Sequence, residues 1–332
     1  MRLVALDLVR FFAAMSVMVY HYTVSSANHF ETLSNFSQFG YLGVPIFFII
    51  SGYVIALSAN NRSAYEFAVS RFTRLYPAFW AGIAFTLIVT YTLTTNTYSI
   101  GQILANLTML NDYMGFDDID TIYWTLHKEI QFYACIFLLV FFNLFKHIKI
   151  WLSIWLLITI LFLAIRQPFF MGWFITPEYS SLFIAGISFY LIHKQGVQKF
   201  NLFILFTSLI ISSIYAYNDA LNFMIKPTTQ EQVIAVVLIL SFHLFFYLLV
   251  TNKICMRKNQ FYLILGALTY PLYLIHSVAG HAIINGPLKF MSKGSAVLVT
   301  IVLMIFFAYL IHVLIERKIA TKLKARLIGD PS

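Results

Sequence analysis

An aspartate, an arginine and a histidine interrupt the segment LDLVRFFAAMSVMVYHY, residues 6–22, which is otherwise apolar enough for lipid. Ionisable groups at membrane depth are costly and usually mark function. Arg10 and His21 are eleven residues apart, so on a helix they share one side about 16 Å apart, and Asp7 can pair with Arg10. The spacing predicts an ion pair near the inner end of a span and a candidate general base near its outer end. The alternative is that Asp7 and Arg10 lie at one lipid interface while His21 reaches the other.

A second polar group interrupts the segment YWTLHKEIQFY, residues 123–133. His127, Lys128 and Glu129 are consecutive, so on a helix they cannot all face one way. Counted from residue 122, Glu129 lies about 10 Å below the outer face, close to the depth expected for His21. A carboxylate beside an imidazole is the usual means of orienting a general base. We therefore expect Glu129 to lie beside His21, with a packing hydrogen bond between helices as the alternative.

Two further apolar segments carry residues suited to lining a cavity. In LGALTYPLYLIHSVAGHAII, residues 265–284, Pro271 stands between Tyr270 and His276. It is expected to kink or break the helix and to free carbonyl groups, which is tolerated where a cavity is lined. In FFIISGYVI, residues 47–55, Ser51 and Gly52 permit close approach of a helix or a ligand.

The segment RFTRLYPAFW, residues 71–80, begins with two arginines three residues apart. On a helix, Arg71 and Arg74 present two guanidinium groups on one face, which suits a phosphate. The alternative is that both are anchors on the cytoplasmic side of the membrane.

The elements that position these residues are long apolar segments. The chain is 60% hydrophobic and 11% charged, whereas soluble domains carry about 25% charged residues. Because a span needs roughly 20 apolar residues, we predict an all-α integral membrane protein with about ten transmembrane helices. The expected spans are 5–24, 40–59, 75–94, 122–145, 150–166, 179–193, 200–217, 232–251, 261–284 and 295–315. The longest link, 95–121, is too polar to span and is expected to cap one face.

Positive charge predicts the orientation of these spans. With the N-terminus inside, 16 of the 22 lysines and arginines fall on the cytoplasmic side, 4 outside and 2 within spans. This follows the positive-inside rule, so both termini are predicted to be cytoplasmic. The net charge of +9 then results mostly from the lysines and arginines that set the orientation of the spans. The tail ERKIATKLKARL is expected to meet anionic lipid rather than nucleic acid.

Cysteine usage and the N-terminal segment exclude other classes. Cys135 and Cys255 are far apart and form no CxxC motif, so neither a disulfide framework nor a metal site is predicted. Asp7 and Arg10 argue against a cleavable signal peptide. Residues 1–332 are expected to form one multi-span domain with no appended soluble domain.

In their order along the chain, these segments resemble one family, the membrane acyltransferase family 3, which modifies carbohydrates of bacterial envelopes. LDLVRFFAAMSVMVYHY resembles its opening motif, GVPIFFIISGYVI its second-span signature and RFTRLYPAFW its arginine-rich inner loop. YWTLHKEIQFY resembles its tryptophan-to-glutamate motif, which here runs from Trp124 to Glu129. LTYPLYLIH resembles its late-span motif, and Glu316 before Arg317 its terminal acidic-basic pair. A small residue and a valine are common before the glutamate in the family, where this chain has a histidine and a lysine.

The resemblance implies transfer of an acyl group, expected to be acetyl, from cytoplasmic acyl-CoA to a hydroxyl of an envelope carbohydrate such as lipopolysaccharide or exopolysaccharide. It implies a multi-pass protein of the bacterial inner membrane, with His21 as base or acyl carrier and Glu129 in the catalytic centre. Arg10, Arg71 and Arg74 are implied in binding acyl-CoA. No bound cofactor or metal is implied, because acyl-CoA is a co-substrate.

Four further side chains are candidate pocket or substrate residues, and Tyr270 is the candidate donor to a developing oxyanion. They are Ser51, Trp124, Tyr270 and His276. Direct transfer and an acyl-histidine intermediate both remain open. Without the resemblance, the ionisable residues and the broken helix suit a transporter of a small molecule or a lipid-linked sugar equally well. A structural subunit of a polysaccharide assembly machine is a third reading.

Overall fold

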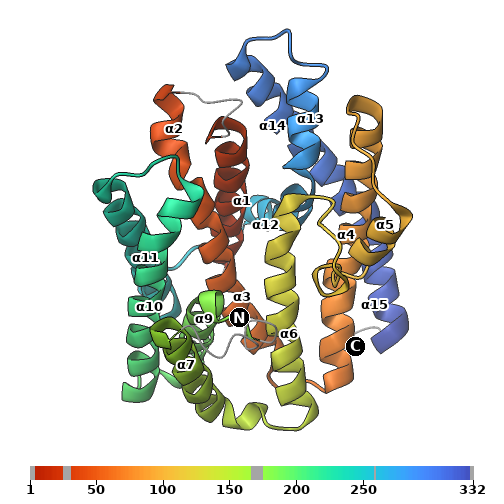
Figure 1. The fold of residues 1–332 in the computed structure, drawn as a ribbon. Helices are drawn as coiled ribbons and strands as arrows, with labels where there is room; N and C mark the ends of the chain where they lie inside the picture. Colours follow the sequence, from red (N-terminus) through yellow and green to blue (C-terminus); the bar gives the residue numbers. More distant parts are fainter. Residues whose placement is uncertain (1–3, 25–30, 166–174, 258, 330–332) are drawn as a thin grey trace.

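The computed structural model describes residues 4–24, 31–165, 175–257 and 259–329, and every described element is a helix (Figure 1). The α-helices are α1 (Val4–Val24), α2 (Glu31–Ser37), α3 (Gly43–Ala59), α4 (Ala64–Leu93), α5 (Ile100–Asn106), α6 (Trp124–Phe141), α7 (Ile148–Ile165), α9 (Pro177–Gln195), α10 (Lys199–Phe223), α11 (Thr229–Val250), α12 (Gln260–Ile275), α13 (Val278–Asn285), α14 (Lys293–Ile311) and α15 (Thr321–Ile328). Short 3₁₀ turns include η1 (Gln38–Leu42) and η3 (Thr121–Tyr123), and a π-helix, η6 (His312–Ala320), joins α14 to α15.

The long helices run between the same two ends of a bundle. In Figure 1 the links that follow α10 and α13 lie at the upper end, and those from α3 to α4 and from α6 to α7 lie at the lower end. This grouping is the one expected of loops on the two sides of a membrane, since lipid does not tolerate exposed loops at depth.

Seven helices of the described residues are long and apolar enough to cross a membrane, or eight if α12 and α13, which meet at a bend of 70°, form one span. The chain is therefore a multi-pass membrane protein. The predicted count of ten is not confirmed, because α6 and α9 are not among these helices. Residues 180–192 of α9 are all buried and include three serines, and α6 carries His127, Lys128 and Glu129. These polar residues lower the hydropathy of both helices. The cytoplasmic placement of both termini remains a prediction.

Helices α3 and α9 cross closely because each carries a glycine at the crossing. A Cβ atom on Gly52 would lie 2.3 Å from the carbonyl oxygen of Phe183, and one on Gly186 would lie 2.1 Å from that of Ile49. Small residues allow the backbones of membrane helices to approach in this way. The close helix approach predicted for Gly52 is confirmed.

The chain turns sharply between α12 and α13, at His276 and Ser277. The predicted break is present, but Pro271 lies inside α12 and the turn comes later. The carbonyl groups at the turn are satisfied by side chains: the Tyr22 hydroxyl donates to the carbonyl of His276 at 2.5 Å, and Nδ1 of His276 bonds to the carbonyl of Tyr273 at 2.7 Å. The turn thereby ties α12 and α13 to α1.

The link between α4 and α6 lies along the side of α4, so the expectation that it caps one face is wrong. The Tyr76 hydroxyl donates to the carbonyl of Thr108 at 2.8 Å, and the indole of Trp80 donates to that of Leu107 at 2.9 Å. Within the link, Asn106 accepts a hydrogen bond from the amide of residue 119 at 3.0 Å. Because these groups satisfy its backbone, the link can lie beside a helix instead of over the end of the bundle.

Candidate active site

Three histidines from two segments meet at the end of α1. The rings of His21 and His276 have centroids 5.3 Å apart, and Nε2 of His281 lies 3.0 Å from the carbonyl oxygen of His21. A carbonyl oxygen only accepts hydrogen bonds, so Nδ1 of His276 carries its proton toward Tyr273 and, in the neutral ring, Nε2 is an acceptor. That Nε2 is buried and has no hydrogen-bond partner among the described residues. His21 therefore has a second imidazole, with acceptor capacity, as its neighbour.

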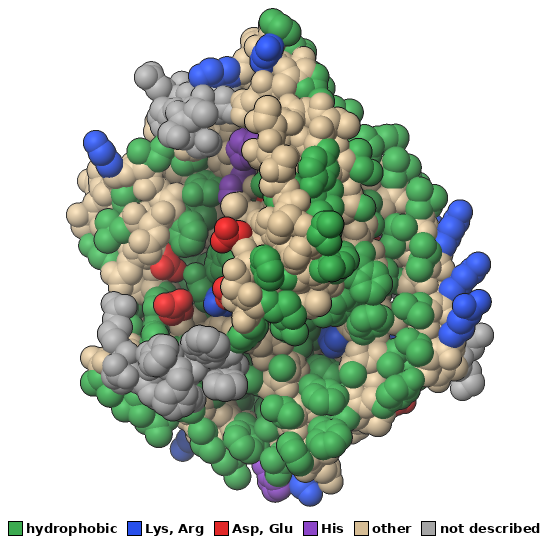
Figure 2. Space-filling model, turned by 45° about the vertical axis from the view of Figure 1, so that its right-hand side comes forward, with side chains coloured by type: hydrophobic (Ala, Val, Ile, Leu, Met, Phe, Trp, Pro, Cys, Tyr) green, Lys and Arg blue, Asp and Glu red, His purple; other side chains and the backbone are tan. Residues whose placement is uncertain are grey.

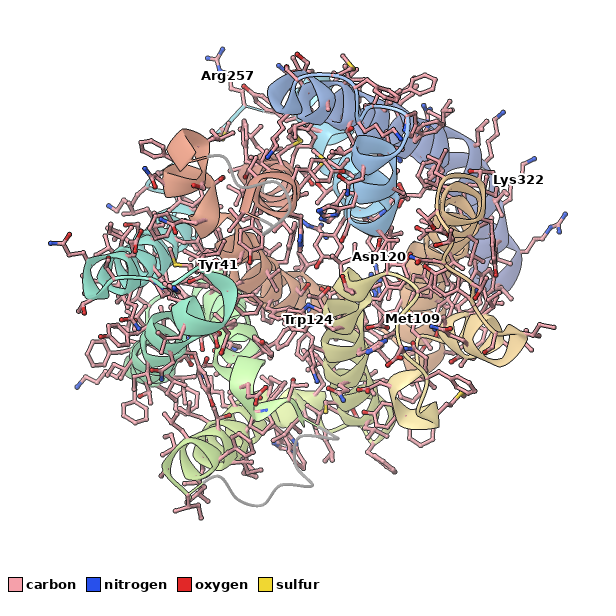
Figure 3. The ribbon with its side chains drawn as sticks, turned by 45° about the horizontal axis from the view of Figure 1, so that its top comes forward. Tyr41, Met109, Asp120, Trp124, Arg257 and Lys322 are labelled. Atoms are coloured by element: carbon pink, nitrogen blue, oxygen red, sulfur yellow. The ribbon has the colours of Figure 1, made fainter. Side chains whose placement is uncertain are left out.

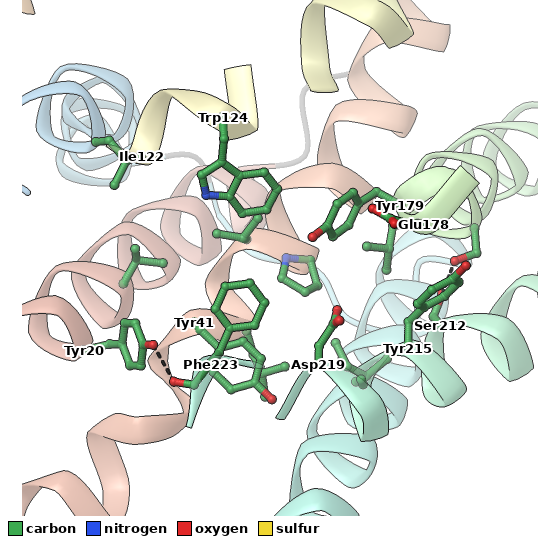
Figure 4. A pocket seen from close by; sticks show the side chains of 18 of the residues that line it. Tyr20, Tyr41, Ile122, Trp124, Glu178, Tyr179, Ser212, Tyr215, Asp219 and Phe223 are labelled. Carbon is green, nitrogen blue, oxygen red and sulfur yellow. Dashed lines mark hydrogen bonds between the residues drawn. The ribbon is translucent and has the colours of Figure 1, made fainter. Parts of the chain in front are cut away.

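Two cavities meet at His21. The histidine cleft has a volume of about 680 Å³ and opens at the upper end of the bundle. Its lining includes His21, His281, Thr121, Asn222 and Ser277. The aromatic cavity has a volume of about 140 Å³ and is lined by His21 together with aromatic and acidic side chains (Figure 4). Figure 2 shows acidic and histidine side chains inside a hollow with hydrophobic walls.

A third, smaller cavity continues from the aromatic cavity toward the arginines. This arginine cavity has a volume of about 50 Å³, and both Arg10 and Glu129 line it. Val44 and Tyr273 line the aromatic cavity and the arginine cavity alike. The three cavities thus follow one another along α1, from Arg10 to the open cleft at His21.

The arginines of α4 lie against polar partners on other helices. Arg74 makes an ion pair with Glu316 of the π-helix η6 at 2.7 Å, and its guanidinium lies 5.6 Å from the centre of the Tyr270 ring. Arg71 donates to the hydroxyls of Ser58 and Ser70 at 3.4 and 3.1 Å. Nε of Arg71 is buried and has no hydrogen-bond partner in the part of the chain that the structure describes. Three guanidinium groups therefore gather here, because the charge of Arg74 also acts on Arg10.

Glu129 belongs to this arginine group, and the expectation that it lies beside His21 is wrong. Its carboxylate accepts a short hydrogen bond from the Ser51 hydroxyl, and its charge acts on both Arg10 and Arg71. The charges that act on His21 are those of His276, at the turn, and His281, in α13. Residue counts along single helices give depth and not the contacts between helices, and the contact that places Glu129 is the one it makes with Ser51 of α3.

The remaining candidate residues divide between the cavities. Trp124 lines the aromatic cavity, with its ring centroid 5.4 Å from that of Tyr179. Tyr270 lines the arginine cavity, and its hydroxyl donates to the carbonyl of Leu75 at 3.1 Å. Tyr270 therefore has no free proton for an oxyanion at His21, which overturns its expected role as that donor. The Ser51 hydroxyl is used by Glu129.

The link before α6 is fastened to the turn between α12 and α13 by Asp120. Its carboxylate accepts hydrogen bonds from the amides of Val278 at 2.9 Å and Ile122 at 3.3 Å. Burial raises the pKa of Asp120 to about 7, against the opposing effect of these hydrogen bonds. Viewed with the top of the bundle tilted forward, Asp120 and Trp124 lie near the middle, whereas Lys322 lies at the rim (Figure 3). His127 faces this link, with Nε2 3.3 Å from Asp118.

Sequence reasoning missed several residues of the site. His281 was not singled out, although it stands five residues after His276 on the far side of a predicted break. Asp120 lies in the polar link 95–121 and was not singled out either. The acidic residues of the aromatic cavity, Glu178 and Asp219, stand near the ends of expected spans and gave no motif. No group of three or more His, Cys, Asp or Glu residues within the described ranges could hold a metal ion.

The structure is a bundle of membrane-crossing helices with half-buried arginines at one end of a series of cavities and histidines at the other, an arrangement that suits a multi-pass membrane enzyme or a transporter. The chain matches the family model of the acyltransferase domain of acyltransferase family 3 over residues 3–317. The chain belongs to this family and is a membrane acyltransferase. No curated protein and no solved structure matches it.

Proposed function

We propose that the protein transfers an acetyl group from cytoplasmic acetyl-CoA to a hydroxyl of a carbohydrate in the bacterial envelope, within the inner membrane. The observation that carries the proposal is the shared lining of the three cavities. His21 lines both the histidine cleft and the aromatic cavity, and Tyr273 lines both the aromatic cavity and the arginine cavity. A donor held at the arginines and an acceptor entering the cleft can therefore meet at His21.

In the proposed mechanism the phosphate groups of acyl-CoA bind at Arg71 and Arg74, and its thioester extends past Arg10 toward His21. The His21 imidazole removes the proton of the acceptor hydroxyl. The hydroxyl oxygen then forms a bond to the thioester carbonyl carbon, the carbon–sulfur bond breaks, and the proton passes from His21 to the departing sulfur. The ring of His276 lies beside that of His21, and its unpartnered Nε2 is the acceptor that would hold the His21 ring in the tautomer that acts as base once the two rings approach within hydrogen-bond distance.

Acetyl transfer by purified His21→Ala in nanodiscs tests the chemistry. Loss of a general base lowers the rate by about 10² to 10⁴, and loss of a covalent acyl carrier abolishes turnover. CoA binding by calorimetry and the thermal melt should stay unchanged. The matched control is His243→Ala, because His243 is also buried in a helix, where it bonds to the carbonyl of Ile239. A rate of acetyl transfer by His21→Ala close to that of the wild type would exclude the mechanism. Loss of transfer together with a large fall in melting temperature would instead indicate that His21 only packs helices together.

Arg71→Ala and Arg74→Ala test the donor site. Losing a charge-assisted contact costs about 1.5–3 kcal/mol, so we expect the Michaelis constant for acetyl-CoA to rise about tenfold or more, with that of the acceptor unchanged. Lys149→Ala is the control, since Lys149 lies at the same lower end and donates to Gln198. An unchanged Michaelis constant for acetyl-CoA in both variants would indicate that Arg71 and Arg74 are membrane anchors.

A transporter is the second candidate function, because the bend of 70° between α12 and α13 lies beside connected cavities and broken helices at a cavity are typical of transporters. Nanodiscs separate no compartments. Acetyl transfer in nanodiscs therefore supports the enzyme, whereas substrate uptake by sealed vesicles without any transfer would support the transporter.

A further inference from the structure

We propose that the aromatic cavity binds the acceptor sugar, and that Asp219 and Glu178 make it select sugar rings without acidic groups. The inference rests on the proposed function and specifies its substrate class. Asp219 lies on α10 and Glu178 on the first turn of α9, and both line this cavity (Figure 4).

The walls of the cavity suit a sugar ring. Aromatic side chains from six elements line it, among them Tyr41, Trp124, Tyr179 and Phe223. Tyr41 and Phe223 stack with ring centroids 5.1 Å apart, and Trp124 and Tyr179 lie 5.4 Å apart. Such rings present large flat surfaces with polar edges, which match the C–H faces and the hydroxyl rim of a sugar. Ligand sites are typically apolar pockets with a few placed polar groups.

The placed polar groups are two carboxylates. Asp219 is half-buried and Glu178 is exposed, and both line the cavity together with Tyr179. The described lining residues of the cavity include no lysine or arginine. Ionised carboxylates only accept hydrogen bonds, so they bind the hydroxyl or ammonium donors of a sugar and repel a uronic acid or a phosphate.

A third polar group in the cavity wall is unsatisfied. Tyr41 is 5% exposed, and its hydroxyl has no hydrogen-bond partner among the described residues. Asp219 is the carboxylate whose charge acts on this hydroxyl. A buried hydroxyl without a partner is costly, and a sugar hydroxyl placed between Tyr41 and Asp219 would bond to both.

The cavity also has the required position relative to the chemistry. His21 and Tyr20 line both the aromatic cavity and the open histidine cleft, so a sugar can enter from the cleft and present a hydroxyl to the His21 imidazole. The competing occupant is the acyl chain of the donor. An alkyl chain would offer no hydrogen bond to the buried Tyr41 hydroxyl or to the half-buried Asp219 carboxylate, which favours the sugar.

The test measures binding and transfer separately, with three probes: methyl glucoside, methyl glucosaminide and methyl glucuronide. In nanodiscs, calorimetry should detect the first two and not the glucuronide. Asp219→Asn and Glu178→Gln should raise the acceptor Michaelis constant for methyl glucoside about tenfold or more without changing that of acetyl-CoA. In both variants, the acceptor Michaelis constant for methyl glucuronide should fall relative to that for methyl glucoside. Asp117→Asn is the control, since it removes an exposed carboxylate of the link before α6.

Each result separates this inference from the proposed function. Sugar binding that depends on Asp219 without any acetyl transfer would retain the subsite and reject the acetyltransferase. Acetyl transfer with an unchanged Michaelis constant for methyl glucoside in both variants would contradict the assignment of the cavity to the sugar. Use of methyl glucuronide by the wild type as efficient as that of methyl glucoside would contradict it as well. Improved use of longer acyl-CoA donors by Asp219→Asn, with sugar constants unchanged, would assign the cavity to the acyl chain.

Discussion

The Glu129→Gln substitution separates two roles for this carboxylate, because the structure places it with the arginines and not with His21. The change keeps the shape of the side chain and removes its charge. Ser51 loses a charged acceptor, and Arg10 and Arg71 lose a carboxylate whose charge acts on both. We expect loss of acyl transfer with weakened or disordered donor binding, through the arginines.

The magnitude follows from the partners. A hydrogen bond to a charged group contributes about 1.5–3 kcal/mol, and removal of one member of a buried ion pair costs about 3–5 kcal/mol. Glu129, Arg10 and Arg71 are only half-buried by their accessible surface, so the lower range applies and we expect about 2 kcal/mol. A double-mutant cycle with Ser51→Ala isolates the pair, and it should show a coupling energy of about 0.5–3 kcal/mol.

The assay is the pH profile of kcat/KM for acetyl-CoA, measured below donor saturation, alongside the melt. If Glu129 acts through the arginines, the variant loses rate at every pH and the acidic limb of the profile stays in place. If it instead oriented His21, the imidazolium would lose a stabilising charge and the acidic limb would move to lower pH. Such a shift, together with unchanged acetyl-CoA binding, would refute the assignment of Glu129 to the arginine group.

Three further outcomes are expected. Gly52→Ala should lower the melting temperature and the yield of folded protein, because its Cβ would lie 2.3 Å from a carbonyl oxygen of α9, whereas Gly294→Ala meets nothing within 4 Å and should be neutral. The folded-state pKa of Asp120, about 7, lies above the ordinary pKa of an aspartate, so the folded state binds more protons. Melting temperature should therefore fall as pH rises from about 4 to 7, and Asp120→Asn should flatten this dependence. In a cysteine-free background, a cysteine at Asn222 should react with an impermeant reagent from outside and one at Asn61 should not.

Much of the helical fold could be predicted, because apolar length alone determines which segments can cross lipid. Helix α9 is surrounded by protein, and the link before α6 satisfies its own backbone with Asn and Asp side chains, so neither follows rules written for a helix against lipid. Hydropathy therefore predicts which helices face lipid and says less about those that are enclosed.

The site was predicted less completely, because sequence spacing reports the face of one helix and not the contacts between helices. Arg10 and His21 were placed on one stripe by spacing within α1, and the cavities follow that stripe. The partner of His21 could not be found in this way. His276 reaches it only because the chain turns between α12 and α13, and the position of that turn depends on hydrogen bonds from Tyr22 and to Tyr273.

The packing of α1 explains why one helix carries residues for both ends of the reaction. A Cβ on Gly40 would lie 2.2 Å from the carbonyl of Ser16, one on Gly43 would lie 2.5 Å from that of Ala13, and one on Gly266 would lie 2.5 Å from the Cβ of Asp7. Glycines of three segments thus press against α1 along its length and leave it no room to slide. A helix fixed in this way holds its arginine and its histidine at a constant separation of about 16 Å. Donor binding and proton removal can then be matched to one substrate geometry, which is the reason, on the proposed mechanism, for placing ionisable residues in a segment otherwise fit for lipid.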